Sequence, residues 1–230
     1  MQRMKTAIIC AIDSEFSFYL NAMEDITTSK TANLIFHLGK INGKEIIAVC
    51  CGVCKVNAAI AAQILISEYK AGTVICSGVA GGIDNNLKIG DTVICTKVAY
   101  HDVTKNMLSD YHPYLSDENF HSDENLLRLC KKAVESADFS QKIYFGKIVT
   151  GEAFIDQDGR EEIIENHNPL CVDMETGAIA HVCYANSVPF IAVRSISDTE
   201  EKSGVDSFEA NCSFAAEKSF DVVMELLGRI

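Results

Sequence analysis

The chain has 230 residues, of which 48% are hydrophobic and 23% charged, so it can bury a core and is not disordered. This length favours one domain over residues 1–230. Its 20 Lys and Arg against 32 Asp and Glu give a net charge of -12, which excludes polyanionic nucleic acids and anionic lipid surfaces as expected partners.

Apolar runs of strand length recur along the chain and alternate with helical patterns. The predicted strands are residues 6–12, 46–51, 73–76, 92–96, 143–149 and 190–193. The runs are continuous, as in strands that are covered on both faces. The predicted helices are residues 57–66, 126–134, 178–183 and 214–227. Ser122 opens the second of these, with Asp123 and Glu124 in its first turn.

The alternation of strands and helices predicts an α/β fold with a largely parallel or mixed sheet. No linker rich in Gly or Ser divides the chain. The least ordered segments are expected to be the polar loops at residues 102–124 and 199–206.

The ten cysteines are interpreted as free thiols of a cytoplasmic protein. The apolar run near the N-terminus, residues 7–12, is too short for the core of a signal peptide. No stretch approaches the roughly 18 apolar residues of a membrane helix. Most of the cysteines lie inside apolar runs, where a reduced cysteine packs as a small hydrophobic residue.

Polar residues follow several predicted strands, at the sheet edge where ligands collect in open α/β folds. These segments are residues 13–15, 77–82, 150–155 and 194–198. They bring carboxylates, hydroxyls and glycines to strand ends that would converge. The sequence therefore predicts a small-molecule site at this edge.

Glu175 gives the sharpest local signal, because its spacing with Ala178, Ile179 and Val182 places a carboxylate in line with an apolar helix face. A buried carboxylate needs donors, so Glu175 either serves a ligand or is an acid at the start of a helix. Glu15 has the same two interpretations. Asp198 is either a site residue or a turn or cap residue.

No cofactor or metal ion is expected. The glycine-rich segment at 78–82 lacks the G-x-G-x-x-G spacing, and no P-loop motif occurs. The C-x-x-C at residues 51–54 has no second pair that would complete a zinc site, and the histidines have no metal-binding spacing. A redox dithiol there is less favoured than two packing thiols.

Seven segments, taken together and in order, resemble the 5′-methylthioadenosine/S-adenosylhomocysteine nucleosidases, a branch of the nucleoside phosphorylase family. They are AIDSE at 11–15, GVAGG at 78–82, LKIGD at 87–91, YHD at 100–102, GEAFI at 151–155, VDMETGAIAHVC at 172–183 and VRSISD at 193–198. Each motif is weak alone, but their order over nearly the whole chain is specific.

The resemblance implies a single-domain three-layer α/β/α sandwich with a mixed central sheet. The implied activity is hydrolysis of the adenine N-glycosidic bond of methylthioadenosine and S-adenosylhomocysteine, and also of 5′-deoxyadenosine. It implies Glu15 as the general base that deprotonates the attacking water, and Asp198 as the general acid that protonates N7 of adenine. Glu175 would bind the ribose hydroxyls, close to the developing cation.

The resemblance also implies further substrate contacts, from Gly81, Phe154, Ile155, Met174, Arg194, Ser197 and Phe208. Phe154 would stack on adenine, and the backbone of Ile155 would read the adenine edge. Met174 would pack beneath the ribose and Phe208 would close over the site. Arg194 would hold the water and Glu15, and the stretch at 199–206 would act as a lid.

The chain departs from the family pattern at three places. Val79 stands where many relatives carry Ser, and Thr104 replaces a frequent Asp after the YHD segment. The family's S-G-I-G-K turn is CGVCK at residues 51–55. The resemblance further implies a homodimer whose partner subunit helps to shape the pocket for the 5′ substituent, with roles in methionine salvage, S-adenosylhomocysteine degradation and amino-acid biosynthesis.

Three other functions stay open. A phosphorylase of the same fold would need arginines for phosphate, including one before the glycine-rich turn, where Cys76 stands instead. A non-catalytic nucleoside-binding or storage relative is disfavoured because Glu15, Glu175 and Asp198 are all present. A nucleosidase for another adenosine derivative, such as aminofutalosine, is the third alternative.

Overall fold

The computed structural model describes residues 5–111, 115 and 117–230, so parts of the N-terminus and of the loop expected at 102–124 lie outside the described residues. Its strands are β1 (Lys5–Cys10), β2 (Glu24–Thr31), β3 (Leu34–Ile41), β4 (Lys44–Cys50), β5 (Ala71–Gly82), β6 (Thr92–Tyr100), β7 (Phe120–His121), β8 (Ile143–Thr150), β9 (Cys171–Asp173) and β10 (Phe190–Asp198). Its helices are α1 (Asp13–Ala22), α2 (Lys55–Ser67), α3 (Met107–Tyr111), α4 (Glu124–Ser136), α5 (Arg160–His167), α6 (Thr176–Ala185) and α7 (Val205–Leu227).

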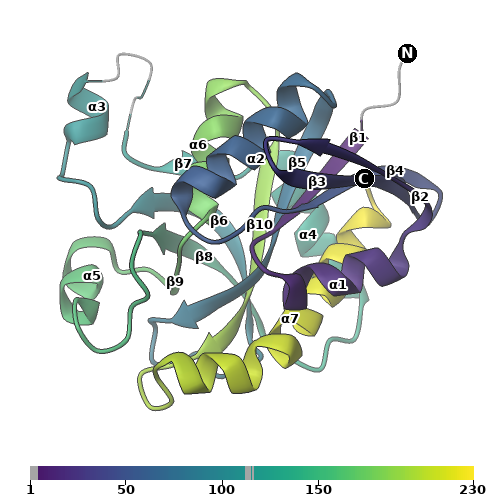
Figure 1. Cartoon of the computed structure of the whole chain (residues 1–230). Helices are drawn as coiled ribbons and strands as arrows, with labels where there is room; N and C mark the ends of the chain where they lie inside the picture. The colour runs from purple at the N-terminus through teal and green to yellow at the C-terminus, as the bar shows by residue number, and fades with distance from the viewer. Residues whose placement is uncertain (1–4, 112–114, 116) are drawn as a thin grey trace.

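The strands form one mixed sheet, as predicted. On one side of β5 the sheet continues through β1, β4, β3 and β2 (Figure 1). On the other side, β10 runs parallel to β5 and antiparallel to β6, while β9 joins β8 to β5. Strands β5, β10, β6, β8 and β9 therefore close into a ring. This closure, which the sequence patterns did not predict, brings the ends of β5, β9 and β10 together.

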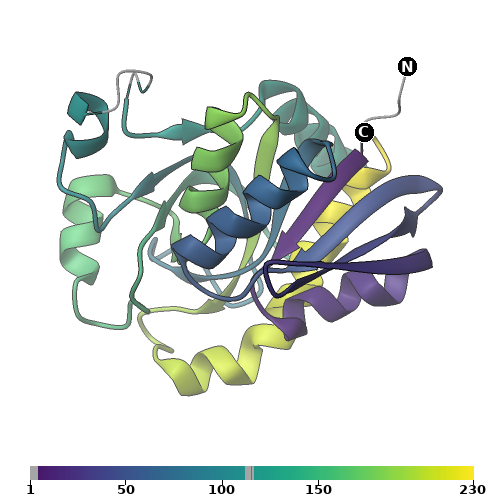
Figure 2. The ribbon, with the colours of Figure 1, turned by 45° about the horizontal axis from the view of Figure 1, so that its top comes forward.

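Helices cover both faces of the sheet, which confirms the predicted three-layer arrangement (Figure 2). Helices α1, α4 and α7 pack over one face, around a core that includes Ile8, Ile75 and Val223. Helices α2 and α6 lie side by side on the other face. The small side chains of α2 that face the core, among them Ala58 and Ala61, are fully buried.

Several strands are longer than their apolar runs predicted. Strand β5 continues to Gly82 and β10 continues to Asp198, and residues of their polar ends pair directly, Arg194 with Gly78 and Asp198 with Gly81. Hydrogen bonds to neighbouring strands hold these ends extended although their side chains are polar or absent. As a result, Gly81 lies on a rigid strand, as do Arg194, Ser197 and Asp198.

Other boundaries were predicted wrongly. Helix α4 is capped by Asp123, whose carboxylate accepts the N–H of Leu126 at 2.9 Å, and Ser122 instead donates to the carbonyl of Cys95. Helix α7 begins at Val205, so the loop after β10 ends at residue 204 instead of 206. The stretch 102–124 contains α3 and β7. The hairpin of β2 and β3 was not predicted, because its outer strand, β2, is exposed and carries few apolar residues.

Within the part of the chain that the structure describes, no helix combines the length and the hydropathy that crossing a membrane requires.

Candidate active site

A cavity of about 220 Å³ opens at the carboxyl ends of β5 and β10. It is lined by nine of the ten residues that the sequence singled out: Glu15, Gly81, Phe154, Ile155, Met174, Glu175, Ser197, Asp198 and Phe208. The tenth, Arg194, is buried behind this lining and contacts two of its carboxylates. The segments predicted to converge therefore do converge in the fold.

Glu15 lies in the first turn of α1, with its carboxylate turned inward and only 3% of the residue exposed. Its Oε2 accepts the N–H groups of Ala11 at 2.8 Å and Ile12 at 3.2 Å, and its Oε1 accepts that of Val79 at 2.8 Å. Burial raises the pKa of Glu15, while Arg194 and the three N–H groups act in the opposite direction. A fixed carboxylate with a raised pKa is suited to accept a proton from water.

Arg194 connects the carboxylates of the site. Its Nη2 lies 3.3 Å from Oε2 of Glu175, and its Nη1 lies 3.9 Å from Oε1 of Glu15. Its Nε lies 2.8 Å from Oδ2 of Asp173. One guanidinium thus faces three buried carboxylates, so the cluster is negative when all three are ionised. A pocket of this charge stabilises a substrate that becomes cationic as it reacts.

Asp173 is a site residue that the sequence analysis missed. It ends β9, accepts the hydroxyl of Thr150 at 2.5 Å and also accepts the hydroxyl of Thr176. Together with its ion pair to Arg194, these contacts fix the plane of the guanidinium. The only signal in the sequence was its place two residues before Glu175, inside the family motif at residues 172–183.

Gly78 is a second residue whose role emerges only in the structure. A Cβ atom at this position would lie 2.3 Å from Oε1 of Glu15 and 2.5 Å from Nη1 of Arg194. Both distances are shorter than the contacts that Cβ atoms make in proteins, so a side chain here would push the carboxylate and the guanidinium away. The glycine-rich end of β5 is therefore required because a carboxylate and a guanidinium meet against its backbone.

Glu175 is the N-cap residue of α6 and is 5% exposed. Its Oε1 accepts the backbone N–H of Cys54 at 2.9 Å, and its Oε2 faces Arg194. Burial raises the pKa of Glu175 to about 7, helped by the nearby carboxylate of Asp173 and opposed by Arg194. Both earlier interpretations hold in part, because the residue starts a helix and also lines the cavity.

We predict that Glu175 makes stability depend on pH. Its pKa is near 4.5 in the unfolded chain and about 7 in the folded one, so the unfolded state loses this proton first. The free energy of unfolding should therefore fall as pH rises from about 4.5 to about 7. Glu175→Gln should flatten this slope, measured by urea unfolding at several pH values. An unchanged slope in the variant would contradict the assignment.

Asp198 ends β10 and lines the same cavity as Glu15. The hydroxyl of Ser197 donates to its Oδ1 at 2.7 Å. Burial raises the pKa of Asp198, while Ser197 and the nearby Arg160 lower it and Asp156 adds to the increase. A carboxyl group that retains its proton above the usual pH range can protonate a leaving group.

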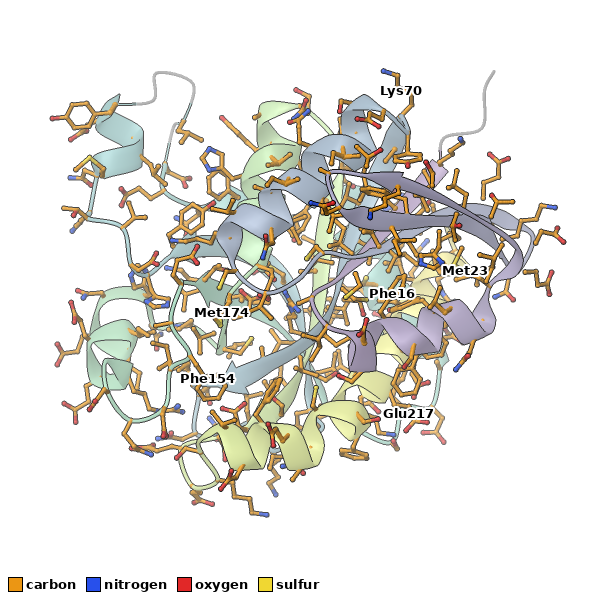
Figure 3. All side chains as sticks on the ribbon, in the orientation of Figure 1. Phe16, Met23, Lys70, Phe154, Met174 and Glu217 are labelled. Atoms are coloured by element: carbon orange, nitrogen blue, oxygen red, sulfur yellow. The ribbon has the colours of Figure 1, made fainter. Side chains whose placement is uncertain are left out.

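The remaining lining of the cavity is apolar. Phe154 and Phe208 meet edge to face, with ring centroids 6.0 Å apart. Phe154 and Met174, both labelled in Figure 3, come from different loops and line the same cavity with Ile155 and Val79. An apolar slot of this kind suits a flat aromatic ring.

The C-x-x-C segment contributes its backbone to the site. All ten cysteines are free thiols in the structure, and burial raises the pKa of Cys50 to about 11 and that of Cys76 to about 12. Cys54 has φ 84°, a conformation that favours glycine, at the position where the family's turn carries Gly. Its N–H holds Glu175. Among the described residues, no cluster of His, Cys, Asp and Glu suits a metal ion.

Fold and site together define an α/β enzyme whose small-molecule cavity is lined by buried carboxyl groups. A family model described as the phosphorylase superfamily matches residues 5–228, and the chain belongs to this family.

Individual relatives support the same placement. The chain is 35% identical to a 5′-methylthioadenosine/S-adenosylhomocysteine nucleosidase of Psychromonas ingrahamii, over 99% of this chain and 100% of the relative. A solved nucleosidase of the same description from Colwellia psychrerythraea 34H, in complex with adenine, has a TM-score of 0.90 and 31% identity, covering 99% of this chain and 96% of that one. The futalosine hydrolase of Helicobacter pylori has a TM-score of 0.88 and 26% identity, covering 99% and 98%.

Proposed function

We propose that the chain hydrolyses the adenine N-glycosidic bond of 5′-methylthioadenosine and S-adenosylhomocysteine, and releases adenine and the 5′-substituted ribose. The observation that carries this proposal is the pair of buried carboxyl groups, Glu15 and Asp198, on one small apolar cavity. The relative from Psychromonas ingrahamii and the solved adenine complex from Colwellia psychrerythraea are both described as 5′-methylthioadenosine/S-adenosylhomocysteine nucleosidases, which supports the proposal.

In the proposed mechanism, Glu15 orients the attacking water and removes its proton. Its carboxylate is held by three backbone N–H groups, so its direction is fixed before the substrate binds. Arg194 lies 3.9 Å away and balances the charge of the base. The proton transfers when the water oxygen bonds to the anomeric carbon of the ribose.

Glu175 accepts hydrogen bonds from the 2′- and 3′-hydroxyls of the ribose, and Met174 packs beneath the sugar. As the bond to adenine breaks, positive charge develops on the ribose ring. The negative cluster of Glu15, Asp173 and Glu175 around Arg194 stabilises this charge more than it stabilises the neutral substrate.

Asp198 donates its proton to N7 of the departing adenine, and Ser197 holds the carboxyl group in place. Phe154 stacks on the adenine ring while the backbone of Ile155 contacts its edge. The backbone of Gly81 lines the same region, close to Asp198. Phe208 lies in the first turn of α7, the helix that follows the loop at 199–204, and closes over the bound nucleoside.

The charges of the site favour water over phosphate as the nucleophile. Arg194 is already engaged by three carboxylates, and none of the described side chains that line the cavity is basic. A phosphate dianion would therefore enter a negative pocket without free charge-assisted donors. This favours a hydrolase over a phosphorylase of the same fold.

The experiment that tests this function is an adenine-release assay across four nucleosides. The panel contains methylthioadenosine, S-adenosylhomocysteine, 5′-deoxyadenosine and aminofutalosine. We expect the highest kcat/KM values for the first two. A strong preference for aminofutalosine would support the alternative suggested by the Helicobacter pylori neighbour. No adenine release from any of them would favour a non-catalytic nucleoside-binding protein.

The assembly that we propose is a cytoplasmic homodimer acting in methionine salvage and S-adenosylhomocysteine degradation. The homodimer is supported by three exposed side chains, Val56 and Ile60 of α2 and Tyr184 of α6, on the face where the two helices lie side by side. An apolar groove runs between them, past Ala59 and Val182. An apolar helix pair of this kind is typical of a subunit interface, and light scattering would detect the dimer.

A further inference from the structure

Arg160 is a buried cation outside the cavity lining, at the first residue of α5. Only 5% of it is exposed, although it follows an exposed loop. Its Nη2 donates to the carbonyl of Gly82 and, at 3.3 Å, to that of Ile83. Arg160 therefore ties the loop that carries Phe154 to the end of β5, beside the backbone of Gly81.

The same loop contacts the segment that follows Asp198. The side-chain amide of Gln157 donates to the carbonyl of Glu200 at 3.3 Å and to the hydroxyl of Ser203 at 3.1 Å. Within the second segment, the backbones of Thr199 and Lys202 exchange two hydrogen bonds of 3.1 Å. The loop that carries Phe154 is thus joined to the segment after Asp198 as well as to the sheet.

One contact between these loops is incomplete. Nε of Arg160 is buried and has no hydrogen-bond partner, although a buried charged donor normally finds one. The carboxylate nearest to it is Glu200, with Oε2 at 4.0 Å and a side chain that is 52% exposed. A small inward movement of the 199–204 loop would turn this long ion pair into a charge-assisted hydrogen bond.

We propose that Arg160 and Glu200 are a positioning pair that fastens the 199–204 loop to the loop that carries Phe154 and keeps Arg160 in place beside Asp198. The inference rests on the proposed role of Asp198 as the general acid. Neither residue touches the substrate; each acts through the loop and through the acid.

The pair has a consequence for the proton on Asp198. The groups that face this carboxyl are Ser197, Arg160 and Asp156, and Glu200 lies behind Arg160. The cation of Arg160 lowers the pKa of Asp198, and the anion of Glu200 offsets that cation. A shorter contact between Glu200 and Arg160 offsets more of this cation, so the acid retains its proton to higher pH.

The test uses Arg160→Met and Glu200→Gln, with Glu201→Gln as the matched control on the same loop. The acid must be protonated, so activity falls as pH rises through its pKa. Arg160→Met should move the alkaline limb of kcat/KM to higher pH, and Glu200→Gln should move it lower, each by about half a unit or more. Glu201→Gln and the charge-conserving Arg160→Lys should leave the limb near the wild-type position.

Hydrogen exchange supplies a readout that needs no activity. In the free protein, the amides of Thr199 and Lys202 should exchange at least about fivefold faster in Glu200→Gln than in Glu201→Gln. Glu200 is half exposed, so its variant is expected to fold even if Arg160→Met does not. The proposal would be overturned if the alkaline limbs of Arg160→Met and Glu200→Gln moved in the same direction. It would also be overturned if the two amides exchanged equally fast in Glu200→Gln and Glu201→Gln. If the wild-type protein released no adenine but exchange was still faster in Glu200→Gln, the result would count against the proposed function and not against the contact between the loops.

Discussion

Replacing Glu15 with Gln should reduce kcat for adenine release by about 10²–10⁴-fold, the usual contribution of a general base. An amide cannot accept the proton of the attacking water. It also offers one oxygen where the carboxylate offers two, and three backbone N–H groups converge on this position. Release of adenine from methylthioadenosine, followed by its absorbance, measures the loss.

The control for this variant is Glu24→Gln, at an exposed position of β2, which should keep full activity. Glu15→Gln loses a hydrogen-bond acceptor but also removes the cost of burying a charge. Because these two effects oppose each other, the melting temperature of the variant should stay within a few degrees of the wild type. A folded Glu15→Gln protein with wild-type kcat would refute the assignment of the base.

The second large effect is expected at Asp198. Asp198→Asn retains the size of the side chain and a partner for Ser197, but it cannot deliver a proton to N7 of adenine. We expect kcat to fall by about 10²–10⁴-fold with little change in KM, because the substrate contacts remain.

A substrate with a different leaving group separates this role from general damage to the site. In the 5-methylthioriboside of 4-nitrophenol, the leaving group is 4-nitrophenolate, a stable anion that needs no acid to protonate it. Asp198→Asn should cleave it at close to the wild-type rate, whereas Glu15→Gln should not. Equal losses on both substrates in Asp198→Asn would contradict the role of the acid.

Motifs in the sequence locate most of the site. Glu15 and Asp198 lie in segments that follow predicted strands, and the carboxyl ends of neighbouring strands meet at one edge of a sheet. Glu175 was singled out by its alignment with an apolar helix face. The cavity lining confirms that these residues converge. Their chemical roles remain predictions, which the variants above test.

The residues that sequence reasoning missed act through contacts between distant segments. Asp173 is important because Thr150, Thr176 and Arg194 meet around it, and no local pattern announces such a cluster. Gly78 is required by two side chains that approach it from other elements. Arg160 lies after a polar loop, where a basic residue would ordinarily face solvent.

The fold was predicted at the level of its layers and less well at its boundaries. Continuous apolar runs identified the central strands, since both faces of these strands are covered. The polar extensions of β5 and β10 depend on pairing between them, which a single-segment pattern does not contain. The closure of the sheet also depends on pairing between distant segments, because β9 pairs with both β5 and β8.

The most direct test of the central claim is a product analysis of methylthioadenosine cleavage in buffer without phosphate. The account predicts adenine and free 5-methylthioribose in equal amounts, at a rate that added phosphate does not increase. Cleavage that requires phosphate and yields the sugar 1-phosphate would contradict it, because a site with three carboxylates around Arg194 should admit water and reject the dianion.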